Sequence, residues 1–212
     1  WYPSYYACLD LVVGESHRDA ILEMVRNRRE LGIQLFLLRS NLAEWLRERI
    51  GDPAVVNFDI LRLGSAVLSA DPVTTGSHSA AFAAMLGYTR IYLLGIDCNY
   101  VEKVQGAVSL GGNILEISEE IENPNYFFDD YQRAGDRFNI PNPNPGLHLR
   151  AWERIAPSVR ARGAEIFNTN ETSAVTFFKE SSVDHFVRCE SLGDHPPLAR
   201  DAHAGVDETG VV

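Results

Sequence analysis

Two short, nearly uninterrupted apolar runs constrain most strongly what this chain can fold into. They are IQLFLL at residues 33–38 and RIYLLGI at residues 90–96. Runs of this length and composition are typical of strands that are buried on both faces of a parallel sheet. Helical patterns separate them from the other strand-like runs, which are YYACLDLVV, AVVNF and AEIFN. The alternation predicts an α/β fold with a mainly parallel sheet flanked by helices.

The chain of 212 residues predicts one domain over residues 1–189, with two segments that depart from the pattern. Residues 101–146 contain GG, ENPNYFFDDY and PNPNPG and are predicted to form a long loop or lid. Residues 190–212 have few large apolar side chains and are predicted to be a disordered acidic tail. The sequence opens on Trp1 with a strand already under way, so we expect upstream sequence and an open sheet edge where an earlier strand belongs.

Composition excludes several classes of protein. The net charge of -10 argues against nucleic-acid binding, because such proteins neutralise phosphates with Lys and Arg. No apolar run approaches the ~18 residues of a transmembrane helix, and the start lacks the features of a signal peptide. The three cysteines are far apart without CxxC spacing, which suits a reducing compartment. We therefore expect a cytoplasmic protein, free or at the inner face of the membrane.

The stretch TTGSHSAAFAAMLGYTRIYLLGIDC carries the main chemical signal. A helix start offers unpaired N–H groups and a partial positive charge that attract a phosphate. The hydroxyls of Thr74, Thr75 and Ser77 add donors, and Gly76 leaves the backbone open to a ligand. Asp97 ends the next strand, at the edge where parallel sheets bind ligands. The stretch predicts a nucleotide cradle, although a simple helix cap and strand end would leave the same pattern.

The same stretch, extended to Tyr100, resembles bacterial CMP-sialic-acid-dependent sialyltransferases, which read roughly Ser/Thr-Gly, an apolar helix, ALGY, IYL and GIDFY. It is equally similar to the MptE-like (6-hydroxymethylpterin diphosphokinase-like) family, whose domain is shared by motility accessory factors that glycosylate flagellin. The later runs NPNYFFDDY and GAEIFNTNETSAVTFFKESSVDHF are similar to the MptE-like pattern as well. The resemblance covers about residues 5–186.

This resemblance implies a Rossmann-like, metal-independent glycosyltransferase of the GT-A-variant type. Its donor would be a CMP-activated acidic sugar, with no other cofactor, and its acceptor a glycan or glycolipid in surface-glycan synthesis. The catalytic histidine of the sialyltransferases, at a downstream helix start, corresponds best to His148. In the family a tyrosine follows GID, whereas here Asn99 takes that place and Tyr100 comes next. The nucleotide-binding residues implied are Thr74, Thr75, Gly76, Ser77, Gly95, Asp97, Asn99 and Tyr100.

Other side chains are weaker candidates. Asp10 ends a strand-like run and is a candidate to face the ligand, and His78 either faces a phosphate or is solvated in the first helical turn. Tyr126 and Tyr131, in the long loop, are candidates to stack on an acceptor sugar. No histidine spacing predicts a metal site, and Asp129-Asp130 is read as an exposed acidic loop. The alternative functions are a pterin diphosphokinase-like enzyme and a non-catalytic nucleotide-binding relative.

Overall fold

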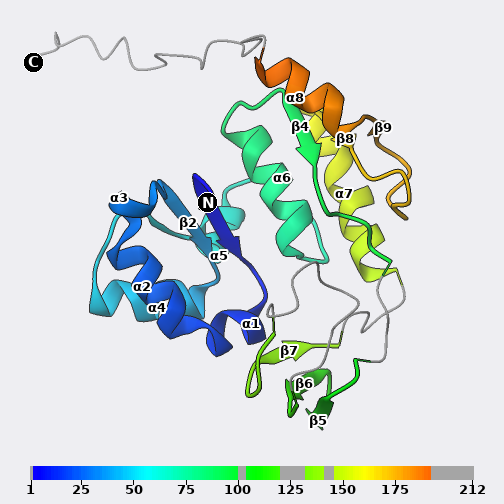
Figure 1. Ribbon diagram of the computed structural model, residues 1–212. Helices are drawn as coiled ribbons and strands as arrows, with labels where there is room; N and C mark the ends of the chain where they lie inside the picture. The colour runs from blue at the N-terminus through cyan, green and yellow to red at the C-terminus, as the bar shows by residue number, and fades with distance from the viewer. Residues whose placement is uncertain (1, 100–103, 120–131, 141–145, 192–212) are drawn as a thin grey trace, which may run out of the picture.

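The computed structural model describes residues 2–99, 104–119, 132–140 and 146–191, and its strands form three sheets (Figure 1). The first sheet is parallel and contains β1 (Tyr5–Cys8), β2 (Leu35–Leu38) and β3 (Val55–Asn57), in that order. The second is also parallel and contains β4 (Arg90–Leu93), β8 (Glu165–Asn168) and β9 (Lys179–Glu180). The third is antiparallel and contains β5 (Ala107–Gly111), β6 (Ile114–Ile117) and β7 (Arg137–Asn139). The expected mixed α/β fold with parallel strands flanked by helices is confirmed, and it is compatible with a Rossmann-like arrangement.

β2 is the central strand of the first sheet, and it is buried on both faces as its apolar run predicts. Phe36 and Leu38 belong to a core cluster with α2 (Arg18–Arg26) and α4 (Ser40–Arg49), whereas Leu37 belongs to a second cluster on the other face. The alternation follows from the two-residue period of a strand. The remaining helices beside this sheet are α1 (Leu11–Ser16), α3 (Arg28–Leu31) and α5 (Phe58–Leu63).

The second cluster joins the two parallel sheets into one core. It combines Leu9 and Leu37 from the first sheet region with Leu93 and Ile166 of the second. α6 (Thr75–Met85) adds Phe82 and several alanines to this cluster, and α7 (Leu147–Ala161) adds Trp152, Ile155 and Val159. α8 (Val183–Ser191) lies at the far end of the second sheet (Figure 1). α7 continues through Pro157, which is exposed. In the described part of the chain no helix has the length and apolar character needed to cross a membrane.

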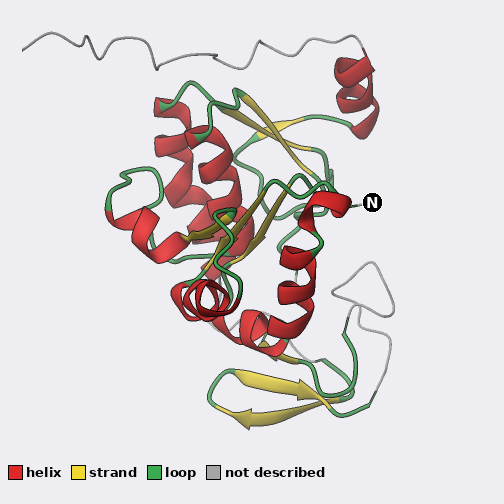
Figure 2. Cartoon of the chain, turned by 90° about the vertical axis from the view of Figure 1, so that its left-hand side faces the viewer, coloured by secondary structure: helices red, strands yellow, loops and turns green. Residues whose placement is uncertain are grey.

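The described residues between 101 and 146 are not a plain loop, so that prediction is wrong for them. β5, β6 and β7 form a small sheet that lies apart from the two parallel sheets (Figures 1 and 2). Val104, Ile117 and Phe138 pack together and against Val13 of α1. The alternation of apolar and polar residues in this segment is short and interrupted by glycines, so the sequence pattern did not predict these strands.

Two local predictions near the N-terminus are also corrected. YYACLDLVV is not one strand, because Asp10 ends it by capping α1, with Oδ1 accepting from the N–H groups of Val12 at 2.8 Å and Val13 at 3.1 Å. The spacing of Ser16 and Asp19 is that of a capping box and predicts a helix start at Ser16. Ser16 is instead the last residue of α1, and its hydroxyl accepts from the backbone N–H of Arg137 at 3.0 Å. Gly32 ends α3 in the left-handed conformation that glycine commonly adopts at helix ends.

The expectation that RIYLLGI is an interior strand is not met. β4 pairs with β8 on one side and is the edge strand of its sheet, as β1 is of the first sheet. An open sheet edge was expected next to an earlier strand, and within the described residues both β1 and β4 have one. The expected tail, residues 190–212, lies almost wholly outside the described residues.

Candidate functional site

The start of α6 meets the carboxyl ends of both parallel sheets. Beyond the end of β1, the backbone N–H of Leu9 donates to Thr75 Oγ1 at 3.0 Å. Beyond the end of β4, Ile96 Cδ1 lies 3.5 Å from the position that a Cβ on Gly76 would take. The structure therefore brings the Thr-Gly turn and the Gly-Ile-Asp turn to one edge, where open α/β sheets bind their ligands.

The first turn of α6 presents unused backbone donors. Thr74 is the N-cap, and its hydroxyl accepts from Ser77 N–H at 3.4 Å. No described residue accepts from the N–H groups of Thr75 or Gly76. The aligned peptide dipoles of this eleven-residue helix add a partial positive charge at the same place. This turn can hold an anionic group.

α7 packs its Trp152 directly against Gly76. The indole Cζ2 lies 3.2 Å from the position of a Cβ at residue 76, and Trp152 is buried. A side chain at residue 76 would have to push the indole aside by a few tenths of an ångström, so packing against Trp152 favours glycine here. The interpretation of Gly76 as an opening for a ligand stays a prediction. Cys98 lies against the same indole. Burial, and then the charge of Asp97, raise the pKa of the Cys98 thiol to about 11, against a lowering by its contact with Trp152, so this thiol is neutral.

The turn after β4 has an unusual backbone. Gly95 has φ +70° and Cys98 has φ +56°, a left-handed conformation that costs a non-glycine residue about 1 kcal/mol or more. Asp97 is exposed, and its Oδ1 accepts from Asn99 N–H at 3.2 Å, which closes the turn. No described residue donates to its second carboxylate oxygen.

The segment after β8 holds this turn in place, a role that the sequence analysis missed. The N–H of Ala174 donates to the carbonyl of Asp97 at 2.8 Å, and Ser173 Oγ donates to the carbonyl of Ile96 at 2.9 Å. Asn99 Nδ2 donates to the carbonyl of Thr172 at 2.7 Å. The polar residues directly after the strand AEIFN could have indicated this role. The carboxyl ends of parallel strands lie at the same edge of a sheet, so these residues are expected beside the turn after β4.

Ser77 and His78 are fully buried, with 0 % of each exposed. His78 Nε2 lies 3.1 Å from the carbonyl of Ala70, which can only accept, so Nε2 carries the proton. Nδ1 then accepts from Ser77 Oγ at 3.1 Å and Thr74 N–H at 3.4 Å. Burial lowers the pKa of His78, so the ring is neutral. Neither expected position of His78, towards a phosphate or in solvent, matches the structure, and Ser77 is not accessible to a ligand.

Asp10 lies at the same edge but is engaged by the protein. Besides capping α1, its two carboxylate oxygens accept from Asn139 Nδ2 at 3.0 and 2.9 Å. This contact fastens the end of β7 beside the end of β1. Asp10 is half-buried, and its geometry is that of a structural anchor.

His148 is in the first turn of α7, as predicted. It precedes Trp152 by four residues, so the two side chains leave the same face of the helix. Because Trp152 lies on Gly76, this face turns towards the start of α6, and His148 is one turn nearer the start of α7 than Trp152. Tyr100, Tyr126, Tyr131 and Asp129-Asp130 lie outside the described residues. Within the described ranges, no group of three His, Cys, Asp or Glu side chains could hold a metal ion.

Comparison with known proteins adds no relative: neither a protein-family model, nor a curated protein, nor a solved structure matches this chain.

Proposed function

We propose that this protein is a glycosyltransferase that binds a CMP-activated acidic sugar at the edge formed by α6, α7 and the turn after β4. The proposal rests on three features that lie at one edge of the sheets. They are the free N–H groups of Thr75 and Gly76, the exposed carboxylate of Asp97 and the first turn of α7. The cytidine nucleotide and the acidic sugar rest on the resemblance of residues 74–100 to sialyltransferases. The parallel strands ending at this edge support a nucleotide site in general.

The phosphate of the donor would lie on the first turn of α6. Thr75 Oγ1 accepts from Leu9 N–H, and among the described residues nothing accepts the hydrogen of its own hydroxyl. That hydroxyl can therefore donate to a phosphate oxygen beside the N–H groups of Thr75 and Gly76. These donors and the helix dipole stabilise the negative charge that grows on the phosphate as it leaves.

Asp97 would bind the nucleoside. Its exposed carboxylate can accept from a ribose hydroxyl or from the amine of the base. Hydrogen bonds to a charged group contribute about 1.5–3 kcal/mol. The hydrogen bonds from Ser173 and Ala174 hold the backbone of the turn from which this carboxylate extends.

His148 would act as the general base. Its imidazole takes the proton of the acceptor hydroxyl, whose oxygen forms a bond to the anomeric carbon of the donor sugar. The bond from that carbon to the phosphate oxygen breaks on the opposite face, and CMP leaves with the electron pair. The reaction inverts the anomeric centre.

A thermal-shift panel with CMP, CDP, UDP, GDP, ATP and 6-hydroxymethylpterin tests the proposal, because a ligand that binds only the folded state stabilises it by mass action. We expect a shift with CMP that is lost in Asp97→Ala, and CMP release from CMP-sialic acid when an acceptor is present. A shift with ATP and the pterin alone would indicate a diphosphokinase instead. CMP binding without turnover would indicate a non-catalytic relative, and no shift with any nucleotide would overturn the site.

A further inference from the structure

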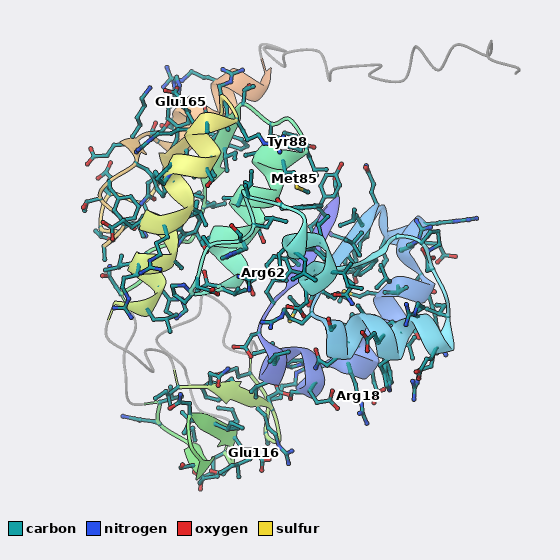
Figure 3. All side chains as sticks on the ribbon, turned by 180° about the vertical axis from the view of Figure 1, so that it is seen from behind. Arg18, Arg62, Met85, Tyr88, Glu116 and Glu165 are labelled. Atoms are coloured by element: carbon teal, nitrogen blue, oxygen red, sulfur yellow. The ribbon has the colours of Figure 1, made fainter. Side chains whose placement is uncertain are left out.

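A cavity of about 130 Å³ lies beside the end of α7, between this helix, β8 and the start of β9. Its floor is apolar and buried, and it consists of Ala156 and Val159 of α7, Ile166 of β8 and Ala164 just before that strand. The two alanines are short and leave space that larger apolar side chains would fill. Glu165, the first residue of β8, is at the rim, at the end of the molecule remote from Glu116 of β6 (Figure 3). The cavity therefore lies at the amino end of the second sheet, away from the candidate site at its carboxyl end.

Two phenylalanines form one wall of this cavity. The rings of Phe177 and Phe178 pack edge to face, with their centroids 4.8 Å apart. Phe177 keeps 38 % of its surface exposed, so the wall has an uncovered part. The volume is close to that of a cavity of roughly 150 Å³, lined by Leu, Ile and Phe, that binds one benzene molecule. A single aromatic ring thus matches both the size of the cavity and its lining, because aromatic rings pack well edge to face or offset.

The rim of the cavity has an excess of positive charge. Lys179 forms an ion pair with Glu165, and these two charges balance. Arg160 is exposed in the last turn of α7, and its guanidinium has no hydrogen bond or ion pair to any described residue. The end of a helix carries about half an elementary negative charge, which the full charge of Arg160 exceeds. A guanidinium presents two parallel N–H groups that fit a carboxylate.

We propose that this cavity binds a small aromatic carboxylate through one ring and one charge. The ring lies against Phe177 and the alanines of the floor, and the carboxylate accepts from the guanidinium of Arg160. Burial of the ring removes apolar surface from water, and the charged hydrogen bonds fix the orientation of the ligand. The cavity shares no residue with the candidate nucleotide site, so the proposal does not depend on the proposed transferase.

Trp152 can report on an occupied cavity. Its indole meets the ring of Phe178 edge to face, with the centroids 5.8 Å apart and an interplanar angle of 82°. Phe178 also lines the cavity, so a ligand there changes the surroundings of a ring that contacts the indole. The chain has three tryptophans, and replacing Trp1 and Trp45 with phenylalanine leaves Trp152 as the only one.

Calorimetric titration with phenylacetate tests the proposal. We expect one molecule to bind per chain with a dissociation constant of about 1 mM or lower, as a ligand of this size permits. Phenylacetamide, which has the same shape without the charge, and 2-phenylethylamine, which has the opposite charge, should each bind about tenfold or more weakly. In the variant with Trp152 alone, phenylacetate should change the tryptophan emission with the same dissociation constant.

Two exposed residues of the cavity supply the variants. Phe177→Ala removes the uncovered wall and Arg160→Gln removes the charge, and each should weaken phenylacetate binding about tenfold or more while keeping the urea midpoint of the parent. Arg162→Gln is the matched control, because Arg162 is exposed and does not line the cavity, and it should bind like the parent. The absence of saturable phenylacetate binding, or equal binding of phenylacetamide, would overturn the proposal. So would parent affinity in Phe177→Ala and Arg160→Gln, or an equal loss in Arg160→Gln and Arg162→Gln, which would indicate a general effect of surface charge.

Discussion

Trp152 of α7 closes the space beside Gly76 of α6, with Cζ2 3.2 Å from where a Cβ would stand. This contact sets how closely the two helices approach at their starts. It also places the indole between the first turn of α6 and Cys98, in the turn after β4. The packing of one tryptophan thus fixes the relative position of three parts of the candidate site.

Replacing Gly76 with valine should therefore destabilise the fold before it affects any ligand. The added side chain must displace the indole or Ile96, and such overpacking costs about 1–3 kcal/mol. Urea unfolding measures the loss. Trp152→Leu in the same chain should recover part of it, because residues in contact do not act additively. Gly64→Val, at a glycine with no atom within 4 Å of its Cβ position, is the matched control. An equal loss with and without Trp152 would show that the contact is not the cause.

Asp97→Ala is the cleaner test of nucleotide binding. The carboxylate is exposed and, among the described residues, accepts only from Asn99 N–H, so the variant should keep its stability within about 0.5 kcal/mol. It should bind CMP about 10- to 100-fold more weakly, as expected for a lost hydrogen bond to a charged group. Calorimetric titration with CMP gives the affinity, and Glu44→Ala, exposed on α4, should bind like the parent. Unchanged affinity in Asp97→Ala would place the nucleotide elsewhere.

His78 should make stability depend on pH. Burial lowers its pKa below the usual 6.5, so the unfolded chain takes up a proton on this side chain at pH values where the folded chain does not. The free energy of unfolding therefore falls as the pH drops from about 7 towards 5. Above the pKa of His78 in the unfolded chain, the contribution of the neutral ring to stability is complete. Urea unfolding across this range should show a weaker pH dependence in His78→Gln than in the parent. Val67→Ala, which weakens the same core but keeps the imidazole, should retain the full dependence. Equal slopes in His78→Gln and the parent would contradict a neutral buried ring.

The amide of Asn139 should hold the small sheet on the rest of the protein. Asn139→Ala removes both hydrogen bonds to the half-buried carboxylate of Asp10 and should cost about 1.5–3 kcal/mol. Amide exchange should rise first in β6 and β7 and leave β2 unchanged. Asn113→Ala, exposed in the β5–β6 turn, is the control. Equal exchange in β2 and β7 of the Asn139 variant would mean that the small sheet has no separate attachment.

Local sequence patterns were sufficient to predict the strands and helices whose buried residues form one continuous apolar run. The run 33–38 predicted β2, and TTGS before an apolar stretch predicted the start of α6. They also predicted that α6 and the end of β4 meet at one edge, because parallel strands leave no other place for their carboxyl ends.

Contacts between distant residues could not be read in this way. Nothing near His78 in the sequence indicates that Ala70 accepts from it, so a buried ring was taken for a surface one. Gly76 was interpreted through a ligand, because Trp152, its actual neighbour, comes 76 residues later in the chain. The strands β5, β6 and β7 were not predicted, because their few apolar side chains are buried against Val13 of α1, which is distant in the sequence.

His148 provides the most demanding test of the proposed transferase. It stands in the first turn of α7 on the face that carries Trp152, which packs on Gly76 of α6. In the proposed reaction its imidazole would take the proton of an acceptor hydroxyl beside a phosphate on α6. His148→Ala should lower turnover of CMP-sialic acid by about 10²-fold or more, the usual contribution of a general base. The CMP-induced thermal shift should stay as in the parent, since the base touches the acceptor and not the nucleotide. Added free imidazole should restore part of the rate in His148→Ala and none in Asp97→Ala, which separates a proton-transfer role from a structural one. His17→Ala is the control. His17 is half-buried and follows the last residue of α1, whereas the candidate edge adjoins the start of that helix, so this variant should transfer sugar at the parent rate. If His148→Ala transfers sugar as fast as the parent, another group takes the proton and His148 has no catalytic role.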